Sequence, residues 1–353
     1  MATKTSLIIV HGMGEHTEAS FKNEIVNSLS YALSLYDDWK GKNIEDLIDI
    51  VPFEYNSIFN KYRETVAEAS KPLSSRLAAL QLDGLNPITG EFIKWDAELN
   101  CDNFFKTHWL DVLFYRYTML AEPVRLKLAE LITKTVDKKG GENVHVLAHS
   151  LGTSVAHDTL ASLYIPTPDP DHPKNLPANA AKLASVHMVA NVSRLLESFV
   201  KVGESIVHPC KSGCTRAYYQ YRHLFDPITI PSPFEPISNG VWLDPFQLKE
   251  MQYQRLRPRL VTELNTHAIT HYLKNPECHV PLLKTLGFEF WPNLNQVKKA
   301  FDKHSEGALQ GKAEMLQQRW EGLNLTNLAS ATAFIKAAQA LRDMLASYGQ
   351  EFK

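Results

Sequence analysis

The sequence has little cysteine, almost no net charge and no long apolar run. Its 353 residues include only 4 cysteines, and the formal net charge at pH 7 is −2. Because it contains no basic stripe and no block of like charges, we expect no nucleic-acid partner. No window approaches the ~20 apolar residues of a membrane-spanning helix. The apolar run near the N-terminus is too short for a signal peptide, so we expect a cytoplasmic protein without a stable membrane anchor.

The scarcity of cysteine also limits the chemistry that thiols can supply. The four are Cys101, Cys210, Cys214 and Cys278. Free thiols are the expected state in a chain without an export signal. Cys210 and Cys214 are spaced more widely than the cysteines of a zinc knuckle, and no second pair completes a site. A metal or redox role for this pair is therefore the weaker alternative.

Short apolar runs alternate with helical periodicity along much of the chain. The apolar runs predict strands at 7–10, 47–53, 143–149, 183–189, 218–225 and 259–264. Helical spacing of apolar residues covers 19–35, 121–138 and 151–164. Strands that alternate with helices indicate an α/β protein with a mostly parallel central sheet and helices on both faces.

Two segments depart from this alternation. Residues 57–120 contain several helical stretches and are interpreted as a helical insertion, which would cover the strand ends if it folds as a cap. Residues 291–353 are interpreted as a helical C-terminal extension. Its apolar stripe indicates internal packing or a homodimer surface rather than a membrane anchor, because the polar face is not strongly basic. The remaining core is expected to comprise residues 1–56 and 121–290.

Ser150 occupies the most informative position in the chain. Residues 148–152 read Ala-His-Ser-Leu-Gly, between a predicted strand and a predicted helix. A serine on such a tight turn exposes its hydroxyl beside helix N-terminal N–H groups, which favour developing negative charge. To act as a nucleophile it also needs a base, a group that orients the base, and oxyanion donors. The alternative is a serine that only caps the helix.

Candidates for the base and its orienting acid follow later predicted strands. The carboxyl ends of parallel strands open on one edge of a sheet, so residues just past them meet in space. His267 is the favoured base, and His271, one helical turn further, is the alternative. Asp226 is the favoured acid, and Asp244 is the alternative because an Asp-Pro pair recurs there. Two histidines at this spacing can bind a metal, but no glutamate lies between them, so we expect no metal.

These motifs together resemble the α/β-hydrolase-fold serine hydrolases, particularly their lipases and esterases. Residues 148–152 resemble the nucleophile elbow, with alanine at its first position instead of glycine. The His11-Gly12 turn after the first apolar run resembles the oxyanion loop. The order Ser150, Asp226, His267 is that of the family. The resemblance covers roughly residues 5–56 and 121–275, and it implies an α/β-hydrolase fold for the core.

The resemblance also implies an activity. A carboxylesterase or lipase is expected, in which Ser150 forms an acyl-enzyme with His267 as general base and Asp226 orienting it. The oxyanion donors would be the main-chain N–H groups of Met13 and Leu151, and no cofactor is required. Three alternatives stay open. They are a thioesterase or amidase on the same triad, a metal-dependent hydrolase using the two histidines, and a non-catalytic binding protein.

Aromatic side chains suggest where a substrate would bind. Phe105 and Trp109 in the predicted insertion, and Phe234 in a proline-rich stretch, are candidates for lining an apolar acyl pocket. The competing interpretation is that the insertion's aromatics form its own core. The expected partner is a small-molecule or lipid ester.

Overall fold

A computed structural model describes most of the predicted core. The described residues are 4–12, 17–61, 115, 121–165, 175–177, 181–193, 205–226, 228–229, 234, 253–263, 265–306 and 308. Most of the predicted insertion, and the predicted C-terminal extension beyond residue 308, lie outside these residues.

The described core is built on a six-stranded sheet. Its strands are β1 (Ser6–Val10), β2 (Asp49–Phe53), β3 (Val144–His149), β6 (Ser185–Val189), β7 (Tyr218–Tyr221) and β8 (Tyr253–Leu256). They lie in the order β2-β1-β3-β6-β7-β8, and every neighbouring pair is parallel. A short parallel pair, β4 (Tyr164–Ile165) with β5 (Leu176–Pro177), forms separately. The predicted α/β class with a parallel sheet is confirmed.

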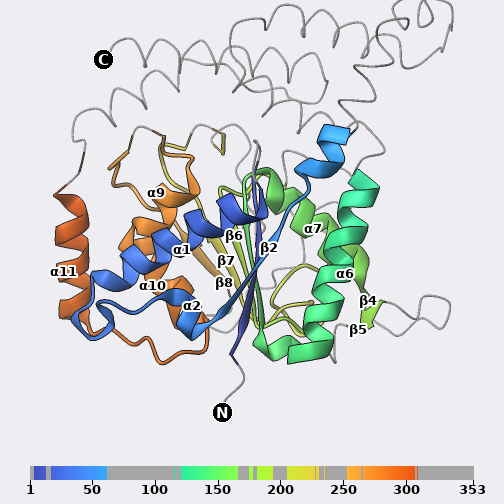
Figure 1. Ribbon diagram of the computed structural model, residues 1–353, viewed down its shortest axis with the longest axis horizontal. Helices are drawn as coiled ribbons and strands as arrows, with labels where there is room; N and C mark the ends of the chain where they lie inside the picture. The colour runs from blue at the N-terminus through green and yellow to red at the C-terminus, as the bar shows by residue number, and fades with distance from the viewer. Residues whose placement is uncertain are drawn as a thin grey trace, which may run out of the picture. The chain divides into compact units, whose positions relative to one another are not determined.

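Helices cover both faces of this sheet (Figure 1). One face carries α1 (Glu18–Ser34), α2 (Ile44–Leu47), α9 (Ile269–Lys274), α10 (Pro276–Thr285) and α11 (Leu294–Ser305). The other carries α6 (Ala121–Lys139) and α7 (Leu151–Leu163). Short 3₁₀ turns are η1 (Asp37–Trp39) and η2 (Gly141–Asn143). Two-sided cover explains why β1, β3 and β6 are buried along their whole length.

Local sequence signals explain where α1 begins and which face it buries. Thr17 accepts a hydrogen bond from the Ser20 N–H, and the Ser20 hydroxyl accepts one from the Thr17 N–H, so the two form a capping box. Phe21, Ile25 and Leu29 follow at helical spacing and are buried against the sheet. The buried stripe anchors α1 beside the loop that leaves β1.

The last strand differs from its prediction. Residues 259–264 were expected to form it, but the structure places β8 at Tyr253–Leu256 and leaves 257–263 without regular structure. Pro258 lacks an N–H and cannot donate to the ladder, although its carbonyl still accepts from the Leu224 N–H over 3.0 Å, so regular pairing ends near it. The half-buried edge strand reads Tyr-Gln-Arg-Leu, so it lacks the apolar run by which buried strands are recognised.

The chain divides into two compact units. The first, which holds the six-stranded sheet, comprises Met1–Gly12, His16–Glu54 and Arg125–Gln318. The second comprises Met13–Glu15, Tyr55–Val124 and Arg319–Lys353. Inside the second unit, the rings of Tyr55 and Phe59 pack edge to face, with centroids 5.3 Å apart. Among the helices that the structure describes, none has both the length and the apolar composition needed to cross a bilayer.

Candidate active site

Ser150 occupies a strained turn between β3 and α7. Its φ of 52° and ψ of −125° lie in a region that residues other than glycine rarely adopt. Its N–H donates to the Val189 carbonyl over 3.0 Å, which ties the turn to the neighbouring strand. Although Ser150 occupies the N-cap position of α7, its side chain makes no capping hydrogen bond. The hydroxyl is therefore directed elsewhere, and the capping interpretation of this serine is not supported.

Two glycines make room for this turn. A Cβ atom at Gly152 would lie 2.7 Å from the Val10 carbonyl oxygen, closer than side chains approach backbone. A Cβ atom at Gly12 would lie 2.8 Å from the Ser150 Cβ and 2.9 Å from Nδ1 of His149. The loop that leaves β1 thus lies directly against the serine turn. Glycine is needed at both positions for space.

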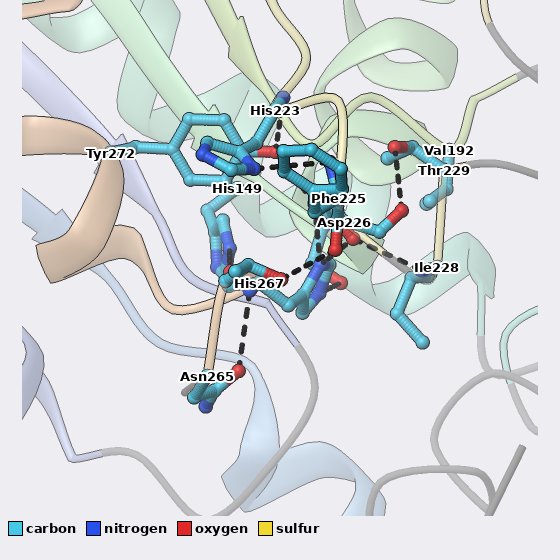
Figure 2. A network of polar contacts seen from close by, with 12 residues as sticks. His149, Val192, His223, Phe225, Asp226, Ile228, Thr229, Asn265, His267 and Tyr272 are labelled. Atoms are coloured by element: carbon cyan, nitrogen blue, oxygen red, sulfur yellow. Dashed lines mark hydrogen bonds and ion pairs between the residues drawn. The ribbon is translucent and has the colours of Figure 1, made fainter. Parts of the chain in front are cut away.

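His267 connects Ser150 to Asp226, and Figure 2 shows His267 beside Asp226. Nε2 of His267 lies 2.8 Å from the Ser150 hydroxyl oxygen. Nδ1 of the same ring lies 2.9 and 3.0 Å from the two carboxylate oxygens of Asp226. Because a carboxylate only accepts, Nδ1 carries the proton, and neutral Nε2 is left to accept from the serine O–H. This is the geometry by which an imidazole removes a hydroxyl proton.

The Asp226 carboxylate is fully buried but well supplied with donors. Besides His267, it accepts from the Tyr272 hydroxyl over 2.6 Å and from the Ile228 N–H over 3.0 Å. Burial alone would raise the pKa of Asp226, but the facing His267 imidazole and these hydrogen bonds outweigh it and hold the pKa below its usual value. The carboxylate is therefore ionised at neutral pH, as the partner of an imidazolium must be.

Hydrogen bonds from its surroundings fix the main chain around His267. The ring of His149 donates through Nε2 to the His267 carbonyl over 2.8 Å. The His267 N–H donates to the Asn265 side chain, and the Thr266 hydroxyl donates to the Phe225 carbonyl over 2.7 Å. The last contact joins the histidine loop to the loop that carries the aspartate. The position of His267 is therefore fixed by these main-chain hydrogen bonds as well as by its contacts with Ser150 and Asp226.

The alternative base, His271, lies elsewhere in the core. Its side chain is fully buried, and its Nε2 accepts from the Thr262 N–H over 3.2 Å. Its ring packs edge-on against His223, with centroids 4.8 Å apart. Burial, aided by the neighbouring histidines, lowers the pKa of His271 to about 3. The His271 ring is neutral, and its acceptor nitrogen is bonded to the main chain, as in a structural group. In His267, by contrast, one ring nitrogen faces Ser150 and the other faces Asp226.

One of the two predicted oxyanion donors lies in the described structure. Leu151 is the first residue of α7, so its N–H has no acceptor within the helix and lies beside the serine. Met13 lies outside the described residues. Just before it, Nδ1 of His11 lies 2.7 Å from the Gly12 carbonyl oxygen and donates to it. His11 therefore holds the start of the loop, as a structural role requires.

Of the other predicted site residues, the structure describes only Phe234. Asp244, Phe105 and Trp109 lie outside the described residues. Phe234 is described and almost fully buried, and its ring stacks on Tyr218 with centroids 5.8 Å apart. This is a packing position, and a role of Phe234 in substrate binding stays a prediction.

Sequence reasoning missed three residues that support the site. Tyr272 contacts Asp226, and His149 holds the backbone of His267. The Thr153 hydroxyl donates to the Ser150 carbonyl over 2.6 Å and accepts from the Val192 N–H over 3.0 Å. His149 and Thr153 flank the serine in sequence, so proximity was an available signal for them.

The described residues hold no group of three or more histidine, cysteine or acidic side chains that could bind a metal ion. His267 and His271 point to different partners and do not form the metal pair considered from their spacing. Burial raises the pKa of the Cys214 thiol to about 12, so it stays protonated rather than becoming a metal-binding thiolate.

Comparisons with known proteins add no family to this geometry. No family model matches the chain, and the search of curated proteins found no significant match.

Proposed function

We propose that the protein is a serine hydrolase of carboxylic esters built on an α/β-hydrolase fold. The observation that carries this proposal is the continuous hydrogen-bonded chain from the Ser150 hydroxyl through His267 to buried Asp226. The strained turn that presents Ser150 between a central strand and a helix supports the same interpretation. So does the order of the three residues along the chain.

In the proposed mechanism, His267 removes the Ser150 proton as the oxygen attacks the ester carbonyl. The tetrahedral oxyanion is stabilised by main-chain N–H groups, with Leu151 as one donor and the loop after Gly12 as the expected source of the second. His267 then passes the proton to the leaving alcohol, and an acyl-enzyme forms. Water, activated by the same imidazole, releases the acid and regenerates the serine. Asp226 fixes the imidazole tautomer and stabilises its cation.

This chemistry needs only the chain's own side chains and main-chain N–H groups, and the expected substrate is a small-molecule or lipid ester. Thioesters and amides are attacked by the same triad, because the triad does not choose the leaving group. A panel of p-nitrophenyl esters of increasing chain length, run beside a matched thioester and anilide, distinguishes these classes. Fastest turnover of the esters is expected.

Covalent labelling tests the proposal directly. A fluorophosphonate probe should label the folded wild-type protein at Ser150, and Ser150→Ala should abolish both labelling and ester hydrolysis. Ser162→Ala is the matched control, since it removes a serine hydroxyl that is hydrogen-bonded within the same helix, to the Asp158 carbonyl. It should label as the wild type does. A folded wild-type protein that neither labels nor hydrolyses any ester would favour a non-catalytic binding protein instead.

A further inference from the structure

We propose that Tyr272 is a positioning residue that holds the Asp226 carboxylate in place for His267. The inference rests on the proposed serine hydrolase function and adds a fourth member to its hydrogen-bonded chain. Tyr272 is fully buried, and its hydroxyl oxygen lies 2.6 Å from Oδ2 of Asp226. Figure 2 shows Tyr272 and His267 both reaching this carboxylate.

The direction of the Tyr272 hydrogen bond is fixed by a second contact. The main-chain N–H of His223 donates to the Tyr272 hydroxyl oxygen over 2.9 Å. Because that N–H occupies the oxygen as an acceptor, the hydroxyl proton is left for Asp226. Burial and the nearby carboxylate raise the pKa of Tyr272 well above its usual value, so the proton stays on the tyrosine. Tyr272 therefore acts as a donor to the carboxylate throughout the proposed cycle.

One short segment carries both side chains that contact the carboxylate. His267 lies just before α9, and Tyr272 lies within that helix. The turn at the start of α9 brings both side chains to Asp226, which itself follows β7. The tyrosine and the Ile228 N–H together restrain rotation of the carboxylate, so that it faces Nδ1 of His267. Without the tyrosine, one of these two restraints is lost.

Tyr272 also tunes the charge that His267 experiences. A strong donor on Oδ2 withdraws negative charge from the carboxylate, which weakens its hold on an imidazolium. Two other titratable groups, His223 and His271, lie close enough to interact with Asp226. Burial lowers the pKa of both, so they are neutral across the working range. A difference between variants in the acid limb of the kcat/KM profile is therefore not expected to come from these two rings.

The first test is Tyr272→Phe, which removes only the hydroxyl. We expect kcat to fall on the order of tenfold to a hundredfold, as for the loss of a hydrogen bond to a charged group, with KM nearly unchanged. The acid limb of kcat/KM should move to higher pH, because the carboxylate then holds the imidazolium more strongly. Tyr164→Phe is the control, since it removes a buried hydroxyl bonded to the Ala181 carbonyl. It should leave both quantities unchanged.

A double-mutant cycle separates positioning from general structural support. The rate of fluorophosphonate labelling is measured for Tyr272→Phe, Asp226→Asn and the double variant. If Tyr272 acts through the carboxylate, its removal should change the Asp226→Asn rate by less than about twofold. The inference would be overturned if Tyr272→Phe lowered the labelling rate by the same factor in the wild-type and the Asp226→Asn proteins. It would also be overturned if the acid limb of kcat/KM did not move in folded Tyr272→Phe.

A third variant covers the case in which Tyr272→Phe fails to fold. Replacing the residue at position 272 with 3-fluorotyrosine keeps the hydroxyl and strengthens it as a donor. The acid limb should then move to lower pH than in the wild type, and an unchanged limb would contradict the proposal. Failure of the proposed function is recognised separately, because the wild-type protein would then neither label nor turn over. If the wild type is labelled and active but the variants at position 272 behave as the wild type does, only the positioning role of Tyr272 is rejected.

Discussion

The ring of His149 donates to the main-chain carbonyl of His267 across 2.8 Å, and the two rings lie 5.0 Å apart. The residue just before the serine thus holds the backbone of the histidine that faces the serine. The position of the proposed base is therefore set relative to the turn itself and not only through Asp226. This tie crosses 118 positions of sequence, so folding of the sheet is required to form it.

Loss of the hydrogen bond between His149 and the His267 carbonyl should slow the proposed ester hydrolysis. His149→Leu removes the donor and lets the His267 backbone shift, so we expect kcat to fall by roughly tenfold, since small misplacements of a reacting group are costly. His149→Gln keeps an N–H donor and should retain most of the activity. Steady-state hydrolysis of a p-nitrophenyl ester measures both. Equal rates for His149→Leu and the wild type would show that the tie does not position the base.

The two histidine candidates should separate cleanly on mutation. Asp226→Asn and His267→Gln should each lower kcat by about 10⁴-fold or more, because the base then loses its tautomer or is absent. His271→Gln should keep kcat near the wild-type value and lower the melting temperature, since its ring supports the backbone at Thr262. Rates are compared well below each variant's melting temperature. Loss of activity in folded His271→Gln, with His267→Gln still active, would reverse the assignment.

Space around the serine turn can be tested at Gly12. Gly12→Ala places a methyl group 2.8 Å from the Ser150 Cβ, so the turn or the loop must shift, and kcat should fall on the order of a hundredfold. Gly41→Ala is the contrast: its φ of +82° strains an alanine, but nothing lies within 4 Å. It should cost about 1 kcal/mol of stability and leave kcat unchanged. Urea unfolding and ester hydrolysis, measured on both variants, distinguish crowding from strain.

His157 should make stability depend on pH. It is buried in α7, and neither ring nitrogen has a hydrogen-bond partner among the described residues. Burial lowers its pKa from 6.5 to about 4. Between these values the unfolded chain binds a proton that the folded protein excludes, so stability falls as the pH falls through this range.

His157→Leu removes the loss of stability at low pH that the buried imidazole causes, and it removes a polar ring without hydrogen-bond partners among the described residues. We expect a gain of about 1 kcal/mol at pH 8, which grows below pH 6.5 by up to about 1.4 kcal/mol per pH unit. Urea unfolding at pH 8 and at pH 5 measures the difference. The other buried histidines are present in both proteins, so their contributions cancel. A gain that is the same at both pH values would contradict the assignment of this ring as a buried neutral group.

The parallel sheet and the grouping of Ser150, Asp226 and His267 could be predicted because both follow from the positions of apolar runs in the sequence. Ser150, Asp226 and His267 each follow an apolar run, and the parallel arrangement brings their side chains together. Their chemical roles stay predictions. β8 was misplaced because its polar edge sequence lacks an apolar signal, whereas residues 259–264, which begin directly after Pro258, carry more apolar side chains.

The contribution of Tyr272 could not be predicted from the sequence. A buried tyrosine beside a helix start is usually a packing residue, and its contact with Asp226 depends on the rotation of α9 against β7. Nothing in the spacing of residues 265–272 fixes that rotation. The close approach at Gly152 is of the same kind, because it depends on how tightly α7 lies against β1.

The serine turn follows β3, which lies between β1 and β6 in the middle of the sheet and not at its edge. Central strands of a packed core open only when the whole unit unfolds, whereas edges and loops fray first. On heating, the Ser150 hydroxyl should consequently keep its position until the cooperative transition, so that loss of fluorophosphonate labelling and loss of secondary structure share one midpoint.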